Sequence, residues 1–219
     1  LVKIFYERQS NINKKTNHGD TAMLYATKYG DIELIDFLID KGAKVVDKDE
    51  DNITTLMYAS RYNNYEVVKT IIDEGANINK RDSSGLNSIF YAATYNPDSR
   101  VINLLVENGA NVNSKNKSGV TALMQASGFN TSEVVKALIK HGADINSKNE
   151  EGYTPILYAA KYSENPKVID VLVENGAEIK GSLFTDLPNP LYQSAKYNNN
   201  PEITKKLIEL GANPNDDYD

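Results

Sequence analysis

The sequence predicts an all-α solenoid of helix–turn–helix units, and two recurring series of residues carry this prediction. The first is an aromatic residue that returns at intervals of 33, 33, 34, 33 and 35 residues, at Tyr29, Tyr62, Tyr95, Phe129, Tyr162 and Tyr197. The second is a Gly-Ala pair of similar period, with its glycine at Gly42, Gly75, Gly109, Gly142, Gly176 and Gly211. A fixed period in this range indicates stacked supersecondary units, because one such unit cannot bury its own apolar face.

The first element of each unit is a short helix with a capping residue at its start. The hydroxyl of Thr121 is suited to accept from the free amides of the first turn. The same position in the other units holds Thr21, Thr54, Asn87, Thr154 and Asn189. Pro155 and Pro190 follow two of these caps, where a missing amide hydrogen costs nothing. The helix is expected to end around Gly30, Asn63, Asn96, Asn130, Ser163 and Asn198. Glycine and asparagine at these ends favour a left-handed turn.

The second element is a helix with two apolar pairs at helical spacing, such as Val67-Val68 followed by Ile71-Ile72. The Gly-Ala pair ends this helix, and a stretch such as Asn-Ile-Asn leads through a polar turn to the next cap. In two units Asn165-Pro166 and Asn200-Pro201 are expected to act as a cap followed by proline at the first helical position. Helices of about nine residues are marginal alone, so packing between units must hold them.

This set of motifs resembles the ankyrin repeat, most closely in "GYTPILYAA" from Gly152 to Ala160 and "GAEIK" from Gly176. The resemblance covers the whole chain and implies an ankyrin-repeat solenoid with short β-hairpin-like finger loops. We expect repeats at 17–49, 50–82, 83–116, 117–149, 150–184 and 185–217 in a single domain. Residues 1–14 align with the second half of a truncated repeat, so the chain is expected to be a fragment of a longer array or a processed product. The family histidine is replaced by Leu24, Met57, Phe90, Met124, Leu157 and Tyr192, which predicts a more apolar helix packing.

Composition and motifs argue against catalysis. The net charge of −6 opposes non-specific binding to nucleic acid, and the chain has no cysteine to bind zinc or attack a substrate. No P-loop, nucleophile elbow or paired-histidine helix is present, and His18 and His141 are far apart in the array. We therefore expect no catalytic residue, metal or cofactor. The chain has no run of about 18 apolar residues, so no membrane span is expected. The compartment is left open, with the cytoplasm favoured.

The aromatic series is the candidate binding site. The resemblance implies that first helices line a concave side, where the family commonly binds partners near the end of each first helix and with the finger loops. A basic residue precedes four of the six aromatic residues, and the fingers carry acids such as Glu150 and Glu151. The candidate partner-binding residues are Lys28, Tyr29, Arg61, Tyr62, Tyr95, Phe129, Lys161, Tyr162, Lys196 and Tyr197. Tyrosine is enriched at interfaces, so we expect a non-catalytic module that binds a protein or peptide with carboxylate and apolar groups.

Several alternatives stay open. The rings of the series could instead stack between adjacent repeats, and the basic residues could serve the helix dipole. One helical turn earlier lies a second file, for which packing is the favoured role, at Tyr25, Tyr58, Tyr91 and Tyr158. Leu183 and Phe184, in an atypical linker, either form an apolar tip or fold back. At the level of function the alternatives are a structural spacer or regulatory domain for a catalytic or other domain elsewhere in the native chain, and oligonucleotide binding.

Overall fold

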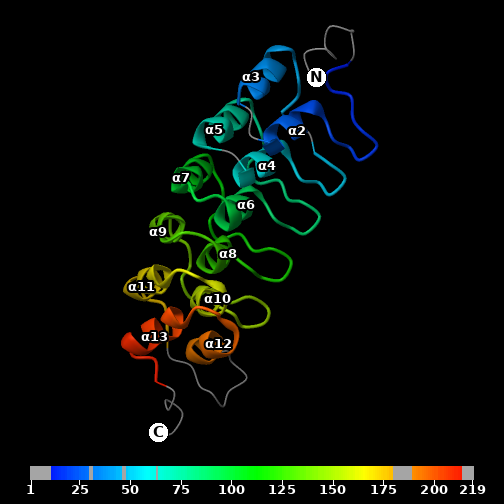
Figure 1. Cartoon of the computed structure of the whole chain (residues 1–219). Coiled ribbons are helices and arrows are strands. Elements are labelled where there is room, and N and C mark those ends of the chain that lie inside the picture. The colour runs from blue at the N-terminus through cyan, green and yellow to red at the C-terminus, as the bar shows by residue number, and fades with distance from the viewer. Residues whose placement is uncertain (1–10, 30–31, 46–47, 63, 180–188, 214–219) are drawn as a thin grey trace.

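A computed structural model of the chain describes residues 11–29, 32–45, 48–62, 64–179 and 189–213. Within these residues it contains twelve α-helices and isolated β-bridges, with no longer strand. The helices form six antiparallel pairs stacked into one array, with the first helices in one column and the second helices in another (Figure 1). None of the helices in the described parts of the chain has the length and apolarity needed to span a bilayer.

The two kinds of helix differ by one residue in length. The first helices have eight residues and end at the recurring aromatic residue: α2 (Ala22–Tyr29), α4 (Thr55–Tyr62), α6 (Ser88–Tyr95), α8 (Ala122–Phe129), α10 (Pro155–Tyr162) and α12 (Pro190–Tyr197). The second helices have nine: α3 (Ile32–Asp40), α5 (Tyr65–Asp73), α7 (Ser99–Glu107), α9 (Ser132–Lys140), α11 (Pro166–Glu174) and α13 (Pro201–Glu209). The all-α solenoid of paired helices is thus confirmed, whereas the exact repeat boundaries stay a prediction.

One apolar core runs through the array from Met23 to Ala212, because each first helix packs on the first helices of neighbouring units and most second helices do the same. The side chains that replace the family histidine belong to this interior in five units, at Leu24, Met57, Phe90, Met124 and Leu157. Tyr192 departs from the expected apolar packing. It is 44% exposed on α12, the last first helix of the described array.

The loops before the first helices project to one side of the array as five fingers (Figure 1). We define them as residues 15–21, 48–54, 81–87, 115–121 and 148–154. An Asx side chain closes each of the last four: Asp82 Oδ1, for example, accepts from the amides of Ser84 (2.8 Å) and Leu86 (2.9 Å). Bridges between Lys48 and Thr54 and between Lys115 and Thr121 make two of the fingers hairpin-like, as the sequence predicts.

Most of the predicted helix starts are confirmed. The side chains of four predicted first-helix caps accept from an amide in the first turn: Thr21, Thr54, Thr121 and Asn189. Asn87 and Thr154 occupy the same position without a side-chain capping bond. Proline is the first residue of α10, α11, α12 and α13, as predicted. A glycine with positive φ, between 80° and 96°, lies two residues after the end of each second helix.

The predicted left-handed conformation after the first helices is wrong at the three asparagines that the structure describes. Asn96, Asn130 and Asn198 follow their helices with φ of −100°, −131° and −93°, in extended conformation. The reason is a bond to the preceding unit. The Asn130 amide nitrogen donates to the carbonyls of Ala93 and Asn96, both at 3.0 Å, and so caps the end of α6. Gly30 and Asn63 lie outside the described residues, as do Leu183, Phe184 and most of the truncated repeat.

We predict that Asn130→Ala lowers the free energy of unfolding by about 2 kcal/mol, because carbonyls at the end of α6 lose their donor in a partly buried place. Urea unfolding followed by circular dichroism measures the change. Asn199→Ala is the matched control, since Asn199 is exposed in the equivalent turn two units later. Equal destabilisation by the two substitutions would contradict the capping role.

Candidate functional site

The six recurring aromatic residues form a row along the column of first helices, which we call the aromatic row (Tyr29, Tyr62, Tyr95, Phe129, Tyr162 and Tyr197). Their exposed fractions run from 40% for Tyr162 to 75% for Tyr29. Among the described residues nine large hydrophobic side chains are exposed, and six of them are this row. Tyr25 and Tyr192 lie on first helices too, and Ile208 is the ninth. The exposed apolar surface is therefore concentrated on one column of helices.

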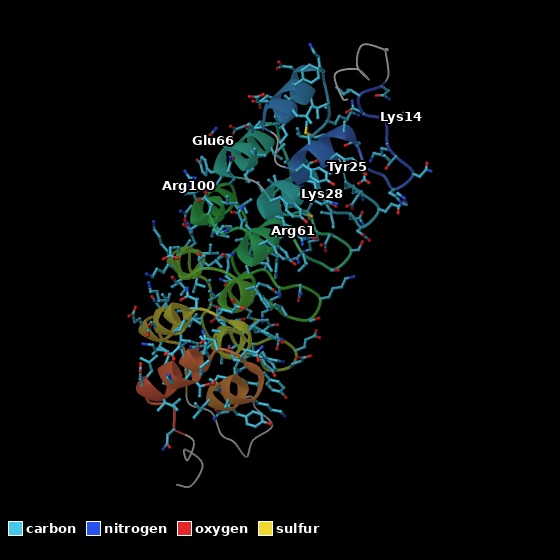
Figure 2. All side chains as sticks on the ribbon, in the orientation of Figure 1. Lys14, Tyr25, Lys28, Arg61, Glu66 and Arg100 are labelled. Atoms are coloured by element: carbon cyan, nitrogen blue, oxygen red, sulfur yellow. The ribbon has the colours of Figure 1, made fainter. Side chains whose placement is uncertain are left out.

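Arg61 links two successive members of the aromatic row. Its guanidinium carbon lies 4.0 Å from the ring centroid of Tyr95 and 4.9 Å from that of Tyr62. These distances are typical of cation–π contacts. The buried Nε of Arg61 has no hydrogen-bond partner in the described part of the chain. The aromatic rings thus hold this cation in place between two units. Figure 2 shows Arg61, Lys28 and Tyr25 along the first helices, while Glu66 and Arg100 lie on the second helices.

Lys161 makes the equivalent link three units later. Its Nζ lies 5.0 Å from the ring centroid of Tyr162 and 5.1 Å from that of Tyr197 in the next unit. A hydrogen bond to the Tyr162 hydroxyl raises the pKa of Lys161. Lys196 lies 4.9 Å from the Tyr197 ring and donates to the Tyr192 hydroxyl at 2.7 Å, which raises its pKa as well. Both lysines therefore remain charged at neutral pH.

The aromatic row differs at Phe129, because no basic residue precedes this ring. Gly128 precedes Phe129, and here the Phe129 and Tyr162 rings stack with centroids 5.1 Å apart. A Cβ atom on Gly128 would lie 3.3 Å from the Cβ atom of Tyr162. Glycine therefore permits this close approach of α8 and α10. Lys28, at the other end of the row, lies 5.8 Å from the Tyr58 ring and does not link two row members.

The four cations of the row have no acidic partner among the described residues. Lys28, Arg61, Lys161 and Lys196 form no ion pair with any carboxylate of the described residues. The exposed acids Glu50, Asp51, Glu150 and Glu151 lie instead on the fingers. The aromatic row thus combines exposed rings with unneutralised positive charge. This combination suits carboxylates next to apolar groups. In the described part of the chain, no three His, Asp or Glu side chains are grouped as metal ligands.

The second file of tyrosines has a different environment. Tyr91 is 7% exposed, and its hydroxyl donates to Asp82 Oδ2 at 2.7 Å. Tyr58 donates to Asp49 Oδ2 at 2.8 Å. Burial, with the hydrogen bond to the carboxylate, raises the pKa of both phenols. Each hydroxyl therefore ties a finger to its helix, which agrees with the packing role favoured from the sequence. Tyr25 differs, since it is 46% exposed and stacks on Tyr29.

Sequence reasoning missed Tyr192 as part of the exposed aromatic surface. Its ring lies 5.1 Å from Lys196 Nζ, so it extends the row across α12. The only signal for it in the sequence is a polar hydroxyl at a position that holds apolar side chains in the five preceding units. The structure places all ten predicted residues on the first helices, but only Arg61 and Lys161 each contact two members of the row.

We predict that Tyr91→Phe lowers the free energy of unfolding by about 1–2 kcal/mol at neutral pH, through loss of the bond to Asp82. The phenol pKa is raised in the fold above its unfolded value near 10, so the wild type loses stability as pH rises above 10. The variant lacks this titration and should show a shallower alkaline loss. Urea unfolding from pH 7 to pH 11 measures both effects. The exposed Tyr95→Phe is the control, and an identical pH profile for wild type and Tyr91→Phe would refute the assignment.

Comparison with known proteins agrees with the geometry. A family model that describes three consecutive ankyrin repeats matches residues 1–82 and again 89–182. No curated protein matches the chain. The match covers most of the chain, and the described helix pairs, glycine-ended second helices and projecting fingers are those of the same repeat. The chain belongs to the ankyrin repeat family.

Proposed function

We propose that this chain is a non-catalytic module that binds another protein through the aromatic row and the adjoining fingers. Ankyrin repeats are generally protein–protein interaction modules, and the family is typically non-catalytic. The observation that carries the proposal is the placement of eight of nine exposed large hydrophobic side chains on the first helices. Concentrated exposed apolar surface marks interaction sites.

The chemistry of the row suggests the chemistry of the partner. Arg61 and Lys161 lie on aromatic rings without an acidic partner in the described array, so a carboxylate from outside gains a charge-assisted contact there. Between them, Tyr95, Phe129 and Tyr162 offer aromatic surface, and Phe129 follows a glycine where four other units carry a cation. We therefore expect acidic groups at both ends of the bound segment and apolar or aromatic groups between them.

The spacing of the two cations sets the length of that segment. Arg61 and Lys161 are three units apart. Packed helices lie about 8–10 Å from one another, so the two cations are separated by about 24–30 Å. An extended peptide covers this distance with about eight residues. Hollows of about 380 and 580 Å³ adjoin the row at Phe129 and Tyr197, and they offer room for side chains of the partner.

A selection from a random peptide library of about twelve residues, displayed on phage, tests the proposal. We expect enriched peptides to carry two acidic clusters about eight residues apart with aromatic or aliphatic residues between them. Binding should weaken as salt rises, because the charged contacts are exposed. Enrichment of basic peptides, or of none, would contradict a basic aromatic binding surface and favour the structural spacer.

We predict that the triple substitution of Tyr62, Tyr95 and Tyr162 by Ala weakens a selected peptide at least about a hundredfold, since aromatic side chains dominate interface energies. The array should stay folded, because these rings are 40–51% exposed. Fluorescence anisotropy measures the affinity and circular dichroism the fold. Ile208→Ala, which removes an exposed apolar side chain outside the row, should leave the affinity unchanged. A melting temperature of the triple variant far below that of the wild type would instead show that the rings hold the solenoid together.

A further inference from the structure

A recurring asparagine after the second helix clamps one unit to the next. Its side-chain amide donates to the carbonyl of the glycine that follows the next second helix. In three of the four described cases its Oδ1 also accepts from the amide two residues beyond that glycine. For Asn113 the partners are Gly142 O at 2.9 Å and Asp144 N at 2.8 Å. The glycine contact recurs at Asn13, Asn79 and Asn146. These bonds satisfy backbone groups at the loop between units.

In the sequence of the second unit, no asparagine occupies the clamp position. Counting 33 residues forward from Asn13, or back from Asn79, reaches Val46, whose side chain has no polar atom. In the next loop, the carbonyl of Gly75 and the amide of Asn77 are the two groups that a clamp asparagine would bind. The amide of Asn77 has no hydrogen-bond partner among the described residues, and neither has its counterpart Asn111, whereas Lys44, Asp144 and Glu178 each donate to a clamp asparagine. One backbone donor is therefore left available at this junction.

A cavity of about 520 Å³ lies at the same junction. Gly75, Ala76 and Asn77 form one wall of the cavity, and Val45 and Leu56 contribute apolar surface. Four basic side chains from three successive fingers or their flanks complete the lining: Lys15, Lys48, Lys80 and Arg81. None of the described lining residues is acidic, in a chain whose net charge is −6.

Hydrogen bonds hold several of these cations in position. Arg81 donates from one guanidinium nitrogen to the carbonyls of Gly85 and Lys115, and Lys48 donates to the Asn52 side chain. None of Lys48, Lys80 and Arg81 forms an ion pair with a carboxylate of the described residues. Their mutual repulsion is relieved when an anion binds among them.

A purely structural role accounts for only part of this arrangement. A basic residue opens every finger, at Lys15, Lys48, Arg81, Lys115 and Lys148, and three of these side chains donate to a carbonyl of the next finger. That role does not explain Lys80. The same position holds Ser114 and Ser147 in the next two units, both buried, and Lys14 two units earlier.

We propose that this cavity is a binding site for a small polyanion of the oligophosphate class, distinct from the aromatic row. Lysine ammonium groups, an arginine guanidinium and a backbone amide are the donors that bind phosphate oxygens in proteins. The volume lies in the range of small-molecule sites, so two or more linked phosphates fit better than a single one. At this junction the sequence offers no clamp asparagine to the Asn77 amide, and Lys80 stands where the next two units have serine.

Isothermal titration calorimetry of the whole chain with tripolyphosphate, at fixed ionic strength, tests the site. Affinity should fall in the order tripolyphosphate, pyrophosphate, inorganic phosphate, because fewer cations are neutralised at each step. Citrate serves as the polycarboxylate probe. Tighter binding of citrate than of tripolyphosphate would overturn the assignment to phosphates, and absence of binding by every probe would overturn the site itself.

Three variants locate the binding. Lys80→Ser copies the residue of the following units and should weaken tripolyphosphate about tenfold. Val46→Asn restores the clamp residue, so it should compete for the Asn77 amide and weaken binding while raising the melting temperature. Lys148→Ser removes an equal charge from the same column of fingers, two units away from Arg81, and should change affinity less than about twofold. Equal losses of affinity for tripolyphosphate in Lys80→Ser and Lys148→Ser would show that only the net charge of the chain matters, and would refute the site.

Discussion

Contact between successive units is the requirement on which this molecule depends, since helices of eight and nine residues are too short to be stable alone. The continuous core from Met23 to Ala212 meets this requirement for the apolar side chains. Asparagine side chains meet the same requirement for the backbone, because they form hydrogen bonds between units. Asn130 reaches back to the end of α6, and Asn113 reaches forward to the loop after α9. Each unit therefore completes the hydrogen bonds of its neighbour, and stability is shared along the array.

What this packing leaves exposed decides where the molecule can bind. The apolar faces of both kinds of helix are committed to the core, whereas the last residue of each first helix lies outside it. Aromatic rings at that position would be costly to expose without a use. Cations lie on several of them, and Arg61 and Lys161 span two units each. The same repetition that builds the core thus also builds a surface of repeated chemistry, in which Thr94 and Gly128 interrupt the series of cations.

Sequence alone predicts what is local or periodic. The helix pairs, the prolines at helix starts and the glycines at the ends of second helices follow from spacing and side-chain chemistry. Prediction from the sequence fails where contacts with a neighbouring unit determine the conformation of a residue. Asn130 is extended because its partners belong to the preceding unit. Tyr91 and Tyr95 are the same residue type one helical turn apart, yet Asp82 draws one inward and the other stays exposed. The candidate row was predictable residue by residue, but its cation–ring contacts depend on the distance between units, which no single unit encodes.

Hydroxyl-radical footprinting read by mass spectrometry tests most directly whether the aromatic row faces a partner. In the free chain Tyr95 and Phe129 should oxidise much faster than Tyr91, because they are 51% exposed and it is 7% exposed. With a selected acidic peptide bound, the row from Tyr62 to Tyr162 should become protected, while Ile208 keeps its rate. Row residues that oxidise as slowly as Tyr91 in the free chain, or that stay unprotected with peptide bound, would contradict the account.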